Sequence, residues 1–269
     1  MKIRKLIKHI IIFFLLTVLT QIGGVVYLFS VYFSRKILRQ FYLKRTLIFV
    51  VLYLFMSFLI VPRIAKYVGR ERISEATNLK AANFLTVLLN RNYVTKKMNV
   101  YLSNVSNRLN QRNDRITILY LDACFPFIKG FPLLPHLSHN DGNKVDFSLV
   151  YQNENGEIVE KNKSISGYGV FENPTEEEFN QTEVCKKKGY FQYDYPKYLT
   201  IWRINSGLKF SEKGTKSLLL AFLETPGLEK LFIEPHLKNR MKLTSEKIRF
   251  HGCGAVRHDD HIHIQIKNN

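Results

Sequence analysis

Two long apolar runs near the N-terminus constrain the fold more than any other feature of this chain. The first, Ile10 to Phe33, contains no Asp, Glu, Lys or Arg, and the second extends from Thr46 to Pro62. A helix of about 20 apolar residues crosses the ~30 Å hydrocarbon layer of a bilayer. The first run is too long for a cleaved signal peptide, and the alternative for the second is a buried or interfacial helix. We expect residues 1–63 to form a membrane anchor with two transmembrane helices.

The segment between the two runs, SRKILRQFYLKR (34–45), is basic and contains no acidic residue. The positive-inside rule places such a short loop on the cytoplasmic side. The large C-terminal part would then face away from the cytoplasm. We therefore expect an integral protein of the cytoplasmic (inner) membrane, with its main domain in the periplasm or at the cell exterior.

Basic charge is not confined to the anchor. Residues 1–62 hold nine of the 40 Lys and Arg and none of the 22 Asp and Glu, so the remainder of the chain is basic as well. A basic surface favours anionic partners such as lipid headgroups, nucleic acid or an acidic wall polymer. The sequence lacks any nucleic-acid recognition motif, so we expect no nucleic-acid partner.

The three cysteines, Cys124, Cys185 and Cys253, form no C-x-x-C pair. A bridge between Cys124 and Cys253 and a set of buried free thiols are both compatible with the sequence. Because the count is odd, we expect a fold that does not depend on disulfides.

Beyond the anchor, the pattern predicts an α+β protein. Residues 64–112 place apolar side chains at three-to-four spacing and predict a helical linker, followed by a folded domain over 113–269. Short runs rich in β-branched and aromatic residues predict strands, and a Ser before an apolar run predicts a helix. The expected strands are 116–122, 144–151, 199–204, 230–237 and 261–267, and the expected helices lie in 173–183 and 211–224.

Histidines gather in two segments, PHLSHNDGNKVDF (135–147) and RHDDHIHIQI (257–266). A catalytic zinc site takes three protein N, O or S donors and leaves a fourth position for water. Gly142 lies between His139 and Asp146 and lets the loop bring both side chains to one ion. His261 and His263 share one face of the expected strand. A set of His, Asp and His suits a hydrolytic zinc site.

The two segments also carry a resemblance. H-x-S-H-x-x-G-x-x-V-D, from His136 to Asp146, and H-D-x-H-x-H, from His258 to His263, resemble in this order the penicillin-insensitive murein endopeptidases. These enzymes share one zinc fold with the D-Ala-D-Ala carboxypeptidases, VanX-type dipeptidases and hedgehog signalling domains. The resemblance covers about residues 115–266. It implies a hedgehog/DD-peptidase-like zinc domain with an antiparallel sheet and flanking helices.

By position, the resemblance implies that His139, Asp146 and His263 are the zinc ligands. His136 matches an additional histidine near the site, in the second shell of the metal. A neighbouring group must also take a proton from the zinc-activated water and pass it to the leaving amine.

The expected catalytic residues are His258, Asp260 and His261. His261 matches the histidine beside the metal and would orient the site or stabilise the oxyanion. The base is open between two candidates: the endopeptidase branch favours His258, and the carboxypeptidase branch favours Asp260. Strand alternation turns Asp260 away from the face of His263 unless the strand is bulged there.

These expectations define a membrane-anchored zinc metallopeptidase. It would hydrolyse amide bonds of the D-Ala-diaminopimelate or D-Ala-D-Ala type in peptidoglycan peptides. The alternative, from another functional class, is a catalytically inactive zinc-containing binding module at the cell envelope. The insertion 152–198 has no counterpart in the family, and neither the bond cut nor the oligomeric state follows from the sequence.

Overall fold

The computed structural model describes residues 2–37, 42–200 and 202–267. Helices and sheets are both present, which confirms the α+β class. The chain divides into two compact units, each built from several segments. The first unit comprises Met1–Ile73, Thr86–Lys96 and Ala123–Gly142, and the second comprises Ser74–Leu85, Lys97–Asp122 and Asn143–Asn269.

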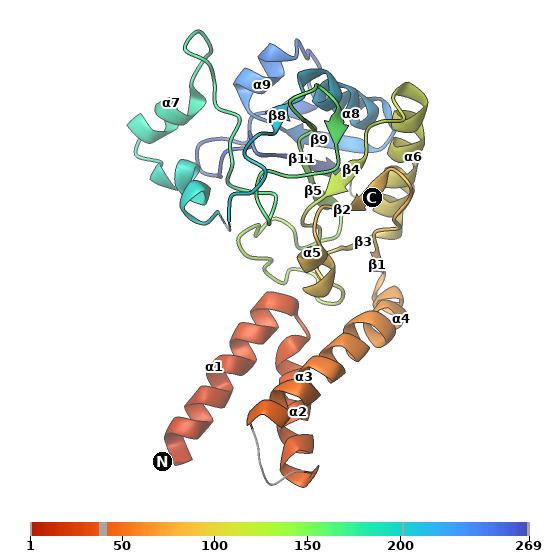
Figure 1. The fold of residues 1–269 in the computed structure, drawn as a ribbon, viewed down its shortest axis with the longest axis vertical. Helices are drawn as coiled ribbons and strands as arrows, with labels where there is room; N and C mark the ends of the chain where they lie inside the picture. The colour runs from red at the N-terminus through yellow and green to blue at the C-terminus, as the bar shows by residue number, and fades with distance from the viewer. Residues whose placement is uncertain (1, 38–41, 201, 268–269) are drawn as a thin grey trace. The chain divides into compact units, whose positions relative to one another are not determined.

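The first apolar run forms two helices, α1 (Lys2–Thr20) and α2 (Gly23–Ile37), which fold back on each other (Figure 1). The chain turns at Gln21, whose φ of 64° lies in the left-handed region. A Cβ on Gly24 would lie 2.0 Å from Thr17 Oγ1, so the close approach of the two helices requires glycine. The expectation of one uninterrupted membrane-crossing helix over residues 10–33 is therefore wrong.

The second apolar run lies in a continuous helical stretch. α3 (Tyr42–Phe55), η1 (Met56–Ile60), α4 (Val61–Ala65) and η2 (Lys66–Val68) follow one another directly. Among the described residues, Lys44–Val68 is the one helix that is long and apolar enough to cross a membrane. Part of the basic loop expected at 34–45, residues 38–41, lies outside the described residues.

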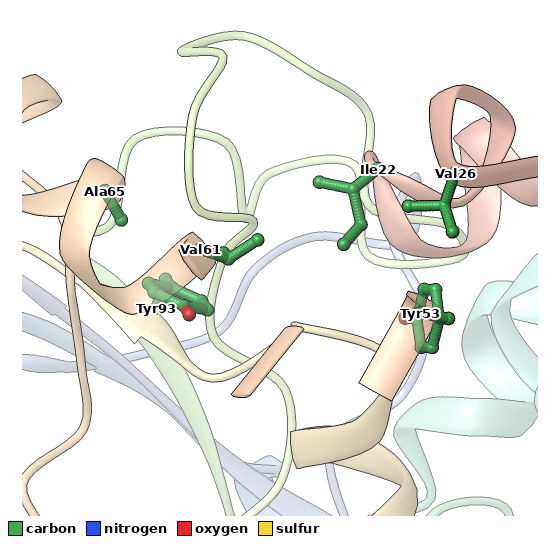
Figure 2. Close-up of a cluster of buried hydrophobic side chains, with 6 residues drawn as sticks. All are labelled: Ile22, Val26, Tyr53, Val61, Ala65 and Tyr93. Atoms are coloured by element: carbon green, nitrogen blue, oxygen red, sulfur yellow. The ribbon is translucent and has the colours of Figure 1, made fainter. Parts of the chain in front are cut away.

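Buried side chains join these helices to the later segments of the first unit. The cluster consists of Ile22, Val26, Tyr53, Val61, Ala65 and Tyr93 (Figure 2). The Tyr53 hydroxyl donates to the Leu88 carbonyl oxygen at 2.7 Å, and the Phe127 N–H donates to Gln21 Oε1 at 2.8 Å. Residues 123–142, which carry His136 and His139 of the first motif, thereby belong to the unit that contains the apolar helices.

The stretch 64–112 is helical only in part, which corrects the expected helical linker. Its long helix is α6 (Lys96–Arg112), and α5 (Phe84–Leu88) is short. The other elements are the two-residue strands β1 (Glu71–Arg72) and β3 (Tyr93–Val94), which pair with each other, and β2 (Leu79–Ala81). The apolar spacing was misleading because Leu79 packs from a strand: it lies opposite Ile118 in a parallel pair.

The second unit contains a six-stranded sheet with the order β10-β9-β11-β5-β4-β2. Its further strands are β4 (Ile118–Tyr120), β5 (Lys144–Ser148), β9 (Leu228–Phe232), β10 (Ile248–Arg249) and β11 (His261–Ile266). The four central strands pair antiparallel, as expected, whereas the pairs β10–β9 and β2–β4 at the edges are parallel.

The helix α8 (Glu212–Glu224) packs on an apolar face of this sheet, and α6 contacts α8. α8 begins after Ser211, whose hydroxyl accepts from the Gly214 N–H, as the sequence predicted. The ring of Phe222 in α8 packs 4.9 Å from that of Phe147 in β5. The Tyr101 hydroxyl of α6 donates to the Phe222 carbonyl at 2.7 Å, so α6 is held to α8.

The segment between β5 and α8 has only short elements. β6 (Tyr151–Gln152), β7 (Ile158–Val159) and β8 (Lys209–Phe210) form a small sheet. α7 (Gln181–Lys187) begins only after Asn180, so the helix expected from residue 173 starts late. The strand expected at 199–204 is absent from the described part of that range, where only Arg203 forms a bridge, and Ile201 lies outside the described residues.

Two further expectations are corrected near the C-terminus. The strand expected at 230–237 ends at Phe232, because Pro235 opens the short helix α9 (Pro235–Arg240). A disulfide links Cys185 in α7 to Cys253, and Cys124 is a buried free thiol. A bridge between Cys124 and Cys253 is therefore wrong, because Cys253 has another partner.

Candidate metal centre

The pairing of β5 with β11 places the polar residues of both strands on one face of the sheet. Asp146 lies directly opposite His263 in the antiparallel register. Residues in such positions project their side chains to the same side. The Nδ1 atom of His263 lies 2.8 Å from Asp146 Oδ1, and both side chains are buried. The alternate residues Phe147 and Ile262 project to the opposite face, where Phe147 contacts α8.

His139 is oriented by a carbonyl group of its own unit. Its Nδ1 lies 2.9 Å from the Ala123 carbonyl oxygen. A carbonyl can only accept, so Nδ1 carries the proton and Nε2 is the ring nitrogen that has the lone pair. The ring of His136 lies 5.5 Å from that of His139. Gly142 has a φ of 76°, the left-handed conformation that the turn after His139 requires.

Three side chains form a group that could hold a metal ion. His136 and His139 offer imidazole nitrogens, Asp146 offers a carboxylate oxygen, and the three could hold a metal ion. Imidazole nitrogen and carboxylate oxygen are donors that zinc accepts, and other transition metals take them as well. The ligand set expected from the sequence shares His139 and Asp146 with this group. The third ligand differs: the sequence predicts His263, which pairs with Asp146, whereas this group contains His136.

Asp260 contacts His261. One carboxylate oxygen, Oδ1, lies 2.5 Å from His261 Nδ1, and the other accepts from the Gly169 N–H at 2.6 Å. Asp260 directly precedes β11, and the irregularity of that strand lies at its far end, at Gln265. Burial alone would lower the pKa of His261, but the charges of Asp260 and Asp146 raise it to about 9.

His258 is buried at the end of the same motif. Its Nδ1 lies 2.9 Å from the Val256 carbonyl oxygen, so Nε2 is left as the acceptor. Its ring centroid lies 4.5 Å from that of His261 and 6.0 Å from that of His263. Burial, and then the proximity of His261, hold the pKa of His258 well below its usual range.

Sequence reasoning missed Tyr168, which touches two of the expected residues. Its hydroxyl donates to Asp146 Oδ2 at 2.9 Å, and its ring centroid lies 5.0 Å from that of His261. A Cβ on Gly167 would lie 2.3 Å from Leu121 Cδ2, so the approach of this loop to the sheet requires glycine. The signal in the sequence is an aromatic residue between two glycines, S-G-Y-G, in an otherwise polar stretch.

A second missed group lies beside His258. Glu234 Oε1 accepts from the Tyr193 hydroxyl at 2.6 Å and from the His258 backbone N–H at 2.8 Å. The ring of His251 lies 4.1 Å from that of His258. Glu234 and Tyr193 come from distant parts of the sequence, so no local pattern connects them with the motif.

No family model matches the chain, and no curated protein is similar enough to be matched to it. The interpretation of this centre therefore depends on its own residues and their chemistry.

Proposed function

We propose that the chain is a membrane-anchored zinc peptidase that hydrolyses amide bonds in peptidoglycan peptides, of the D-Ala-diaminopimelate or D-Ala-D-Ala type. The observation that carries this proposal is the position of Asp146. Its carboxylate lies 2.8 Å from His263 Nδ1, and it belongs with His139 to the group of side chains that could hold a metal. The resemblance of the two histidine motifs to the murein endopeptidases supports the same reading.

In this proposal His139, Asp146 and His263 are the metal ligands. The donor set fits zinc, and the contact of His139 Nδ1 with the Ala123 carbonyl makes Nε2 the ring nitrogen that would bind it. Bound there, zinc would supply Lewis acidity and a bound water of lowered pKa. His136 stands beside His139 and would act from the second shell.

His258 is the better candidate for the general base. Both carboxylate oxygens of Asp260 are engaged, one by His261 and one by the Gly169 N–H. His258 has one ring nitrogen held by a backbone carbonyl and the other left as an acceptor. His258 would take the proton of the attacking water and pass it to the leaving amine. Asp260 would hold His261 in place to stabilise the oxyanion.

Two observations support a location at the outer side of the cytoplasmic membrane. The helix Lys44–Val68 can span a bilayer, and its apolar side chains, such as Leu47 and Val51, are exposed. The disulfide between Cys185 and Cys253 is typical of proteins outside the reducing cytoplasm. Peptidoglycan is found on that side of the membrane. We propose no nucleic-acid partner.

The proposal is tested by incubating the full chain, in detergent, with purified sacculi and separating the released muropeptides. We expect new products that disappear with a chelator and return with added zinc. His258→Ala should lower the rate by about 10²-fold or more while zinc is retained, because it removes the base and no ligand. Lys213→Ala, on the exposed side of α8, is the control. Bound zinc without any product would contradict the proposal and favour the binding module.

A further inference from the structure

A polar cavity of about 440 Å³ lies in the second unit beside the last histidine motif. Most of its lining comes from the segment 169–203, which overlaps the insertion 152–198. Arg257, which directly precedes His258, completes the lining. A cavity of this volume lies within the range of small-molecule sites.

Arg257 is a fixed, buried part of this cavity. Its guanidinium donates to Asp259 Oδ1 at 2.7 Å, to Asp194 Oδ1 at 3.0 Å and to Asn173 Oδ1 at 2.8 Å. It also lies over the ring of Phe171, 4.1 Å from the centroid. These contacts hold the guanidinium in place, so a ligand would be bound mainly by other cations of the lining.

The charges of the lining favour an anion. The charged residues among them are Lys186, Lys197, Arg203, Arg257, Glu183 and Asp194, four basic and two acidic. Lys186 pairs with Glu183 at 2.9 Å, and Lys197 pairs with Asp194. Within the described part of the chain, no ion pair is formed by Arg203. An arginine fork matches the two oxygens of a carboxylate.

The cavity is connected to the proposed catalytic residues by covalent and hydrogen bonds. Gly169, in its lining, donates its N–H to Asp260 Oδ2 at 2.6 Å. The wall that carries Glu183 and Lys186 belongs to α7, and the disulfide from Cys185 ties α7 to Cys253, four residues before Arg257. A ligand held in this cavity would therefore lie next to the motif.

We infer that this cavity binds a free carboxylate of the peptide substrate, with Arg203 as the principal contact and Lys186 in support. The inference rests on the proposed function, because peptidoglycan peptides carry free carboxylates at their ends and on their diamino acids. The site would select peptides that keep a charged carboxylate near the bond to be cut. It would discriminate against the same peptides with that group amidated.

The test compares binding of N-acetyl-D-alanine with that of its carboxamide, using the zinc-loaded full chain in detergent and ligand-observed NMR. These probes lack the D,D-amide bond, so binding is read without turnover. We expect the acid to bind at least about tenfold more tightly than the amide, the size of one charge-assisted contact. Arg203→Ala should abolish this preference, Arg203→Lys should keep part of it, and Lys213→Ala should leave it unchanged.

Equal binding of acid and amide by the native chain would overturn the inference, as would absence of binding by both. A preference that persists in Arg203→Ala would come from the metal centre, and would overturn it as well. The two proposals fail separately. Loss of hydrolysis of sacculi with an intact, Arg203-dependent preference would reject only the peptidase, and hydrolysis without the preference would reject only the carboxylate site.

Discussion

The strand pair β5–β11 and the segment 152–204 both belong to the second unit, but the first is regular and the second is irregular. β5 and β11 pair over five successive positions, and every residue of β11 is buried. The segment 152–204 has strands of two residues and short helices, and it exposes large side chains such as Phe191, Tyr198 and Trp202. Regular pairing fixes Asp146 and His263, whereas the irregular segment reaches Asp146 through the Tyr168 hydroxyl.

The two regions contribute differently to the candidate site: the strands fix its donor residues, and the irregular segment donates hydrogen bonds to them. A paired strand holds its donors at fixed positions, because the ladder determines both spacing and side. The irregular segment contributes Tyr168, which donates to Asp146, and Gly169, which donates to Asp260. Its own structure depends on side-chain hydrogen bonds, ion pairs and one disulfide. We expect substitutions in the two regions to have clearly different effects.

The largest expected effect is on the stability of the strand pair. Phe147 in β5 is fully buried and packs on Phe222, so Phe147→Ala should lower the free energy of unfolding by about 3–5 kcal/mol. Phe191, in the irregular segment, is 78% exposed, and Phe191→Ala should change it by less than about 0.5 kcal/mol. Denaturant unfolding followed by circular dichroism measures both. Similar losses in the two variants would break the comparison.

The next effect concerns the bridge between Cys185 and Cys253, which are 68 residues apart. Replacing both by Ser should lower the free energy of unfolding by about 2–4 kcal/mol, because the unfolded chain gains conformational entropy. The loss should appear as faster hydrogen exchange and proteolysis within 152–204, while the amides of β11 stay protected. Cys124→Ser, which breaks no bridge, is the control. Uniform loss of protection across the sheet would show that the two regions are not independent.

The same contrast explains what the sequence could and could not predict. β11 is predicted by a short run that is rich in β-branched residues, from His261 to Ile266, and α8 by the Ser211 that precedes an apolar run. Tyr168 was not predicted, because its contacts with Asp146 and His261 arise only when a distant loop folds onto the sheet. Periodicity records which side of an element is buried, and it carries no information on which loop will cover that side.

Two errors outside the site have local causes. The apolar run 10–33 was read by length and charge alone, and the turn at Gln21 and the close approach at Gly24 interrupt it. The apolar spacing in 64–112 fits a helix, yet Leu79 joins the sheet by pairing with Ile118. In both places a contact with a separate element decides the structure of the local sequence.

The smallest expected effect is on the pH dependence of the free energy of unfolding, through Glu178 of the irregular segment. Arg240 donates to both carboxylate oxygens of Glu178, at 2.8 and 2.6 Å, and these hydrogen bonds lower the pKa of Glu178 to about 2. Because the folded pKa lies below the ordinary value, the pair stabilises the fold above about pH 4.5 and loses its effect as the pH falls toward 2. Glu178→Gln should therefore be less stable than the native chain at pH 7, by at most about 1 kcal/mol.

Thermal unfolding of both proteins from pH 7 down to pH 3 measures this dependence. The difference between them should shrink steadily below pH 4.5. Glu183→Gln is the matched control, because Glu183 pairs with Lys186 through a single contact in an exposed position. A difference that does not change with pH would mean that the pair with Arg240 has no role in stability.

Metal content of single variants tests the central claim most directly, because two ligand sets remain in competition. Both contain His139 and Asp146, and they differ in whether His263 or His136 completes the set. The account predicts about one zinc per native chain, by mass spectrometry after dialysis, loss of that zinc in His263→Ala and its retention in His136→Ala. Zinc retained in His263→Ala, or lost from His136→Ala alone, would contradict the account.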